Sequence, residues 1–320
     1  EFLYQYNKSN SVSLRTKLIA HNAKINALAH RFAGVYNFFG NHSWFKTFIG
    51  IHPKRSLPQL HTTTFREWFE GFQQENYLKK VYLFCDEYTN HYDLEIGKKS
   101  VKLLNALGYK VFMPNHPESA RAYISKGFLK EAKAIATQNT HIFSPLITNK
   151  TPLVGIEPSA ILGFRDEYPN LVEADLKACA EHLAKNVLTI EEFLSNEMTL
   201  NKIDVSKFTT TPKTVYYHGH CHQKAVSSNA HAVTILSIPK NFKVHSIDAG
   251  CCGMAGSFGY EKEHYEISMQ VGEERLFPAV RKTDPEAIIA ANGTSCRHQI
   301  QDGTQRESLH PITILRRALV

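Results

Sequence analysis

The sequence predicts an α/β fold of two pseudo-symmetric, Rossmann-like repeats with mostly parallel sheets, preceded by a helical arm. From Lys79 onward short apolar strands alternate with helices, a pattern typical of parallel sheets covered by helices. The same order of strands and helices occurs twice, and the chain before it is helical and rich in aromatic residues. We therefore expect a helical N-terminal arm or linker over 1–78, a first repeat over 79–205 and a second over 206–320.

In the arm, four apolar residues follow the i, i+3, i+4, i+7 spacing of one helix face: Ile25, Leu28, Ala29 and Phe32. Prolines at positions 53 and 58 interrupt the helical pattern. The threonine run 62–64, followed by Glu67, predicts a capping box and a helix that continues through Trp68 and Phe72. We interpret the arm as a segment that packs on the rest of the chain.

The first repeat shows three apolar strands separated by helices. We expect strands over 81–85, 109–112 and 153–156, and a helix over about 126–137. Another helix presents Ile96, Leu103, Leu104 and Leu107 on one face, with Gly108 as its C-terminal stop. The helix after the third strand begins at 157–159, with Pro158 in its first turn.

The second repeat has strands at 215–218, 242–244 and 287–290 and a helix near 226–236. Equivalent positions keep their spacing, because Cys85 precedes Ala160 by 75 residues, as Cys221 precedes Cys296. In the same way, Val111 precedes Glu118 by 7 residues, as Val244 precedes Cys251. The matching distances indicate an internal duplication.

This alignment places the cysteines of the second repeat opposite other residues in the first. Cys251-Cys252-Gly253 lies opposite Glu118-Ser119-Ala120, and Cys296 lies opposite Ala160. Only Cys85 remains, near the counterpart of Cys221. We predict that the second repeat carries the working site and that the first-repeat site is metal-free.

Four of the six cysteines, Cys221, Cys251, Cys252 and Cys296, each follow a predicted strand. Loops at the carboxyl ends of parallel strands meet at one edge of the sheet, so the four side chains should converge. Without a sign of secretion, such cysteines are better interpreted as metal ligands than as disulfide partners. Their spacings of 30, 1 and 44 residues, with no close C-x2-C pair, favour an iron–sulfur cluster over zinc. Four buried free thiols and a strained Cys251–Cys252 disulfide are the alternatives.

Glycines next to the paired cysteines support a cluster. Gly250 and Gly253 permit the backbone angles that aim both thiols at one point, and Gly253 and Gly256 can offer N–H groups to sulfur. Thr294 or Ser295 is expected to cap a helix whose positive end favours a thiolate at Cys296.

Histidines surround the first cysteine, at positions 218, 220 and 222. We expect structural or supporting roles for them, and keep His220 and His298 as reserve ligands. Cys179 is interpreted as a core residue of a helix, and His116 with Glu118 as a remnant polar pair of the first repeat.

Other functional classes lack a signal. No nucleophile–base arrangement and no phosphate-binding glycine motif follows a strand, so we assign no catalytic residue. Lys and Arg (37) exceed Asp and Glu (30) by 7, but the excess is spread along the chain, which argues against nucleic-acid binding. A basic surface that docks on an acidic domain or an anionic membrane remains open. No apolar run approaches the roughly 20 residues that span a bilayer. We expect a cytoplasmic protein, with the inner face of the membrane as an alternative location.

Three stretches of the second repeat carry a resemblance to a known family: His220–Lys224, Cys252–Gly259 and Gly293–Gln299. They resemble the cysteine-rich CCG domain found in heterodisulfide reductase (its B subunit), in anaerobic glycerol-3-phosphate dehydrogenase (its C subunit) and in lactate-utilisation proteins. The resemblance is closest to the C-terminal iron–sulfur region of FAD-linked oxidases of the D-lactate dehydrogenase type. It covers about residues 80–320, because Ile124–Gly127 and Glu157–Ser159 are similar to the family's first repeat.

The resemblance implies a 4Fe–4S cluster, sometimes non-cubane, in each intact repeat. It also implies electron transfer from a flavin to an acceptor, with FAD-binding and ferredoxin-like domains elsewhere in a larger parent oxidoreductase. The chain departs from the pattern at Gln299, where the family has a last cysteine, so the five-ligand, non-cubane form of the cluster is not expected. The alternative, from another functional class, is a structural zinc-binding or docking module without redox activity.

Overall fold

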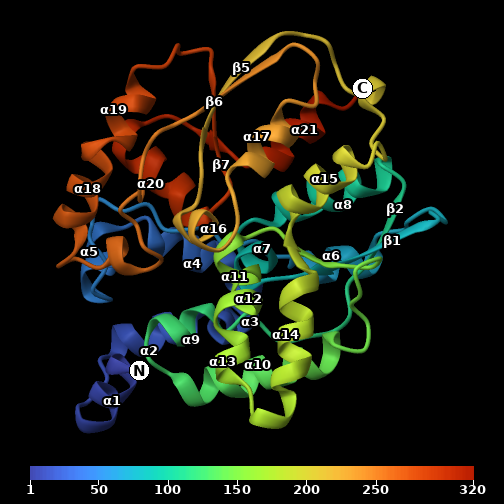
Figure 1. Cartoon of the computed structure of the whole chain (residues 1–320). Helices are drawn as coiled ribbons and strands as arrows, with labels where there is room; N and C mark the ends of the chain where they lie inside the picture. The colour runs from blue at the N-terminus through green and yellow to red at the C-terminus, as the bar shows by residue number, and fades with distance from the viewer.

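The computed structural model describes residues 1–320 and contains two four-stranded parallel sheets with the same strand order, β2-β1-β3-β4 and β6-β5-β7-β8 (Figure 1). The strands are β1 (Lys79–Phe84), β2 (Tyr109–Phe112), β3 (Leu153–Gly155), β4 (Val187–Thr189), β5 (Lys213–His218), β6 (Phe242–Ser246), β7 (Ile288–Ala291) and β8 (Ser308–Leu309). The register also corresponds, since Lys79 pairs with Tyr109 as Lys213 pairs with Phe242. The predicted α/β fold with two repeats is confirmed.

Helices connect the strands and cover both sheets. In the first repeat they are α7 (Glu87–His91), α8 (Leu94–Ala106), α9 (Arg121–Ser125), α10 (Leu129–Phe143), α11 (Pro158–Ile161), α12 (Gly163–Asp166), α13 (Tyr168–Leu171), the 3₁₀ turn η2 (Ala174–Leu176), α14 (Lys177–Asn186), α15 (Ile190–Thr199) and η3 (Val205–Lys207). In the second they are α16 (Cys221–Val226), α17 (Ala230–Leu236), η4 (Phe258–Tyr260), α18 (Tyr265–Glu274), α19 (Leu276–Arg281), α20 (Thr294–Thr304) and α21 (Pro311–Ala318).

Glycine explains where two of these helices end or begin. Gly108, with φ of +86°, follows α8 as predicted. The helix expected over 126–137 instead starts at Leu129, because Gly127 adopts φ of +75° and closes the preceding short helix α9. The helix expected near 226–236 is also different, since a break at Ser227 separates α16 from α17.

The two repeats pack through exchanged helices. The helix after the fourth strand of each repeat packs on the helix between the first two strands of the other: α15 contacts α17, and α21 contacts α8 (Figure 1). The largest hydrophobic cluster accordingly combines first-repeat side chains such as Val101 and Leu104 with Ile312 and Leu315 of the second. The repeats therefore share one core, which fixes the edge of one sheet relative to the other.

Glu191 and His310 lie at corresponding ends of these exchanged helices and are both fully buried. The Nε2 atom of His310 is 3.7 Å from a carboxylate oxygen of Glu191, and neither group has a hydrogen-bond partner there. Burial raises the pKa of Glu191 to about 7 and lowers the pKa of His310 to about 3. Both side chains are thus neutral in the folded protein at mildly acidic pH.

The raised pKa of Glu191 contributes a loss of stability as pH rises, which opposes the gain that the lowered pKa of His310 contributes between about pH 3 and 6.5. The unfolded chain releases this proton near its ordinary pKa of 4.5, whereas the folded protein holds it to about pH 7. The stabilising contribution is complete below pH 4.5 and is lost as pH passes through 7, by about 3 kcal/mol. Glu191→Gln should remove this part of the pH dependence, measured by urea unfolding between about pH 5 and 8. Glu181→Gln, at an exposed position, is the control; an unchanged slope in Glu191→Gln would contradict the prediction.

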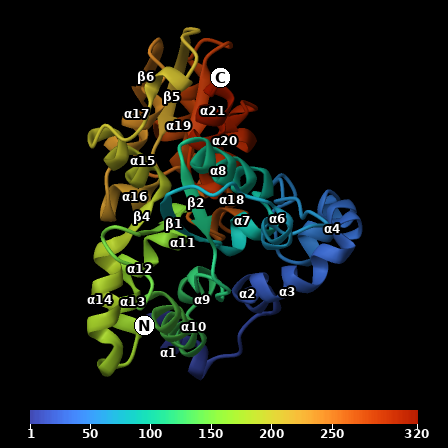
Figure 2. The same cartoon turned by 90° about the vertical axis from the view of Figure 1, so that its right-hand side faces the viewer.

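The arm contains α1 (Phe2–Ser9), α2 (Leu14–Ala20), α3 (Asn22–Ala29), the 3₁₀ turn η1 (His30–Phe32), α4 (Ala33–Gly40), α5 (Ser43–Phe48) and α6 (Phe65–Gly71). It runs along the outside of both repeats (Figure 2), with α2 on α9 and Ile51 bridged to Glu261 of the second repeat. The predicted capping box of Thr64 and Glu67 is confirmed at the start of α6.

The apolar spacing in the arm does not mark its packed face. Leu28 and Phe32 are 76% and 70% exposed, while Ala23 and Asn26 of α3 are buried. Asn26 donates a hydrogen bond to the Tyr92 hydroxyl at 2.7 Å, so α3 contacts the first repeat here through a polar side chain. None of the helices is long and apolar enough to cross a membrane.

Candidate metal centre

The four predicted cysteines reach one edge of the second sheet from three strands. Cys221 starts α16 directly after β5, Cys251 and Cys252 lie in the loop after β6, and Cys296 lies in the first turn of α20 after β7. The central strand β5 pairs with both β6 and β7. The carboxyl ends of the three strands therefore lie side by side, as expected for a site in a parallel sheet.

The four thiols form a continuous line of contacts: Cys221 with Cys251, Cys251 with Cys252, and Cys252 with Cys296. Hydrogen bonds from Cys221 and Cys252 lower the pKa of Cys251 to about 2. A hydrogen bond from Cys252 likewise holds the pKa of Cys296 well below its usual range, whereas the contact with Cys251 raises the pKa of both Cys221 and Cys252. Cys251 and Cys296 thus favour the thiolate form that binds metals, and the other two thiols lie beside them as further donors.

Burial differs across the four cysteines. Cys252 and Cys296 are buried, Cys251 is half-buried and Cys221 is exposed. Cys221 and Cys252 line a largely apolar cavity of about 600 Å³ between the arm and the two repeats. The centre consequently has a buried side, formed by β7 and α20, and an accessible side at Cys221.

Gly253 fixes the turn that holds the paired cysteines. Its φ is +91°, and a Cβ at this position would lie 2.2 Å from the carbonyl oxygen of Ser268. Its N–H donates to the sulfur of Cys251 at 3.3 Å, so the expected backbone contact to sulfur is present. Gly256, with φ of +64°, bends the same loop and lines the cavity.

His220, the N-cap of α16, and Lys224 of α16 stabilise the loops at the carboxyl edge of the second sheet. The Nδ1 atom of His220 accepts the N–H of His222 at 3.2 Å and so caps α16, which is a structural role. Lys224 donates from Nζ to the carbonyl oxygens of Ala249 and Gly250, the latter at 2.7 Å, immediately before Cys251. Lys224 thereby holds the loop that leads into Cys251, and sequence analysis did not identify this role.

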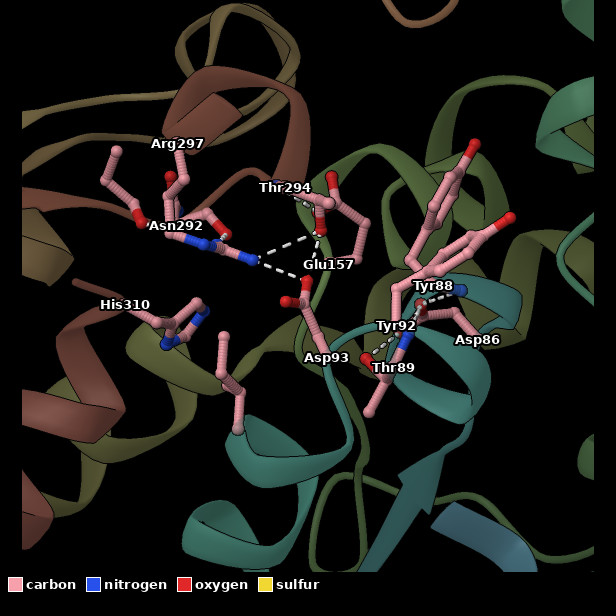
Figure 3. A network of polar contacts seen from close by, with 12 residues as sticks. Asp86, Tyr88, Thr89, Tyr92, Asp93, Glu157, Asn292, Thr294, Arg297 and His310 are labelled. Atoms are coloured by element: carbon pink, nitrogen blue, oxygen red, sulfur yellow. Dashed lines mark hydrogen bonds and ion pairs between the residues drawn. The ribbon is translucent and has the colours of Figure 1, made fainter. Parts of the chain in front are cut away.

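A polar network from the first repeat positions the helix that carries Cys296 (Figure 3). The Thr294 N–H donates to Glu157 Oε2 at 2.8 Å, and its hydroxyl donates to Asp93 Oδ2 at 2.5 Å. Arg297 donates to the same Asp93 oxygen at 2.5 Å. Burial by itself would raise the pKa of Asp93, but Arg297 and Thr294 keep it below its usual value.

The same contacts correct the expected helix cap. Gly293, not Thr294 or Ser295, is the N-cap of α20, because the Thr294 side chain donates to Asp93 and Glu157 of the other repeat instead. A Cβ at Gly293 would meet the His220 ring at 2.4 Å. Cys296 still lies within the first turn, at the positive end of the helix dipole.

His298, the second reserve ligand, faces away from the sulfurs. It lies two residues beyond Cys296 on α20, about 200° around the helix. Its ring lies 6.4 Å from that of Tyr260, and the charges that influence it are Asp93, Arg297, Asp302 and Arg55. The structure does not bring His298 to the cysteines, whereas His218 lies directly beside Cys252 and Cys296.

Arg55 of the arm is a further residue that sequence analysis missed. It is fully buried and donates to Gly259 O at 2.7 Å, Gln299 Oε1 at 2.6 Å and Ser268 Oγ at 2.7 Å. Asp302 lies 3.2 Å away as its ion-pair partner. Arg55 thus connects the loop that follows Cys252, at Gly259, to α20. The Oε1 atom of Gln299 on α20 accepts one of its hydrogen bonds. A lone arginine after a proline gives no sequence signal of burial.

In the first repeat, the remaining cysteine has no second thiol beside it. Cys85 Sγ lies 3.6 Å from Asn90 Oδ1, and burial raises its pKa to about 12. His116 accepts the Cys85 N–H at 3.1 Å, while burial and Glu87 raise the pKa of Glu118 to about 8. No hydrogen bond joins His116 to Glu118, whose Oε2 atom is buried without a hydrogen-bond partner, so the expected polar pair does not form.

Two other positions complete this comparison. Ala160 is buried where the second repeat has Cys296. Cys179 is half-buried on α14 and belongs to none of the hydrophobic clusters, so its interpretation as a core residue is wrong. That the first-repeat site is metal-free stays a prediction.

The chain is thus a two-repeat α/β protein with four cysteines gathered at one sheet edge, and its relatives among curated proteins are dehydrogenases, their subunits and a lactate utilization protein. It is 26% identical over 318 residues to the C subunit of anaerobic glycerol-3-phosphate dehydrogenase of Escherichia coli (strain K12), covering 96% of this chain and 78% of that protein. No family model matches the chain.

Two further relatives are similar at the same level. D-2-hydroxyglutarate dehydrogenase of Pantoea ananatis is 26% identical over 330 residues, which are 98% of this chain and 31% of that protein. Lactate utilization protein A of Bacillus subtilis is 26% identical over 219 residues, 67% of this chain and 87% of that protein. The chain spans less than a third of the hydroxyglutarate enzyme. Two protein groups named by the sequence motifs are therefore found among its relatives.

Proposed function

We propose that this chain is the iron–sulfur electron-transfer module of a larger FAD-linked dehydrogenase that acts on a D-lactate-type 2-hydroxy acid. The observation that carries the proposal is the continuous contact of Cys221, Cys251, Cys252 and Cys296 at the edge of one sheet. Four cysteines that converge from three neighbouring strand ends can supply the four ligands of a single 4Fe–4S centre. Such a centre, when bound, accepts and releases one electron without making or breaking bonds to a substrate.

The residues around the thiols support this role. The N–H of Gly253 and the N-terminus of α20 both direct positive charge toward the sulfurs. A cluster held by four thiolates carries net negative charge, which these groups stabilise. The accessible side at Cys221 leaves a path for electrons to reach or leave the centre.

Oxidation of the hydroxy acid would take place in an FAD-binding domain outside this chain, with a ferredoxin-like domain as an intermediate carrier. The dehydrogenase names of the relatives support this assignment. Exposed apolar side chains of the arm, including Leu28, Phe32, Trp44 and Phe48, offer a surface on which such partner domains would pack. Peripheral membrane association through the same surface is tested by flotation with anionic vesicles.

Metal analysis of anaerobically purified protein tests the proposal. We expect about four iron atoms and four acid-labile sulfides per chain, with a broad visible absorption that decreases on reduction. Zinc without sulfide would instead support the structural zinc or docking module. Protein that binds neither metal under anaerobic reconstitution would rule out both.

A further inference from the structure

We infer that His218 is a direct ligand of the metal centre, so that the donor set combines cysteine thiolates with one imidazole. The inference rests on the proposed function, because it requires a metal centre at the cysteines. It concerns a residue that neither the cysteine spacing nor the reserve histidines His220 and His298 identified.

His218 lies on the buried side of the centre. It is the last residue of β5, pairs in register with Ala291 of β7, and is fully buried. A nitrogen of its ring and the sulfurs of Cys252 and Cys296 all lie within 4.8 Å of one another. The two sulfurs belong to the four thiols of the proposed centre, so a nitrogen of the His218 ring lies among the proposed ligands.

The imidazole has no other partner. Neither Nδ1 nor Nε2 of His218 forms a hydrogen bond of ordinary geometry, although the ring contacts the Cys296 thiol. Leaving a buried polar group unpaired costs about 1–3 kcal/mol, and native proteins seldom do so. His220, in contrast, uses its Nδ1 to cap α16. A metal centre at Cys252 and Cys296 would offer the His218 ring a partner, whereas packing alone does not.

A neutral ligand also suits the buried side electrostatically. Each thiolate adds a negative charge that must be removed from water, and this is costly away from solvent. Imidazole contributes a donor without added charge, while the exposed Cys221 can supply its thiolate on the accessible side. Histidine in place of cysteine raises the reduction potential of iron–sulfur centres. His218 therefore sets the potential of this centre as well as holding it.

The test is pulsed electron paramagnetic resonance of the reduced, reconstituted chain labelled with ¹⁵N-histidine. We expect the strong nitrogen coupling of a directly bound imidazole, which His218→Ala abolishes and the matched control His298→Gln retains. Metal affinity should fall in His218→Ala by more than the about 10- to 100-fold that loss of an outer-shell partner causes, measured as iron retained during competition with a chelator. His218→Cys, which restores a donor at the same position, should retain iron but shift the midpoint potential to a lower value.

Three outcomes would overturn the inference: only the weak coupling of a hydrogen-bonded imidazole, strong coupling that persists in His218→Ala, or an unchanged midpoint potential in His218→Cys. These results are distinguishable from failure of the proposed function. If the proposed function fails, the wild-type chain binds no iron at all. If only the role of His218 fails, the wild-type chain binds iron but shows no directly bound histidine nitrogen.

Discussion

Replacing Cys252 with serine is expected to remove the metal centre altogether. Cys252 is buried and is the thiol that connects Cys251 with Cys296, so its loss divides the four donors into separate groups. A serine hydroxyl does not replace a thiolate in binding iron or zinc. We expect iron and sulfide to fall to less than about a tenth of the wild-type content, because metal binding requires the assembled ligand set.

Stability should fall with the metal. In the loaded protein the metal-binding free energy contributes to folding, so Cys252→Ser should cost more than the roughly 1–3 kcal/mol of one buried group. After removal of iron from both proteins, the two should unfold at nearly the same urea concentration. Cys179→Ser is the matched control, since Cys179 lies on α14 apart from the centre. Wild-type iron content in Cys252→Ser, or equal loss of iron in Cys179→Ser, would refute a centre built around Cys252.

The fold was predictable because its signals are local and repeated. Apolar strands followed by helices identify each α/β unit, and the equal distances from Cys85 to Ala160 and from Cys221 to Cys296 reveal the duplication. The common strand order then follows, because equivalent strands occupy equivalent positions. Convergence of the cysteines could be predicted for the same reason, since all follow strands of one parallel sheet.

The rest depends on contacts between segments far apart in the sequence. The first N–H of α20 is bound by Glu157 of the other repeat, so a local capping pattern at Thr294 was misleading. His218 was not separable from His220 and His222, because alternation along the chain does not show which ring meets the sulfurs. Leu28 and Phe32 follow helical spacing but remain exposed, because the arm packs through other residues.

Replacing Arg55 tests whether the arm positions the metal centre. Arg55 is fully buried, and its ion-pair partner Asp302 is only 7% exposed. Arg55→Met keeps much of the side-chain volume but leaves Asp302 charged and Gln299 and Ser268 without their donor. Removing one member of a buried ion pair typically costs about 3–5 kcal/mol. We expect destabilisation of that size, measured by urea unfolding of the loaded protein, together with reduced iron content.

Arg281→Met is the matched control for this prediction. Arg281 also pairs with a carboxylate, Glu273, and also lies over an aromatic ring, that of Phe277, but both charged side chains are 47% exposed. Such a pair contributes about 0–1 kcal/mol because water screens it. We expect iron loss in Arg55→Met because Arg55 connects Gly259, in the loop after Cys252, to α20, which carries Cys296. If Arg55→Met is no less stable than Arg281→Met and keeps its iron, the arm does not position the centre and serves only to cover it.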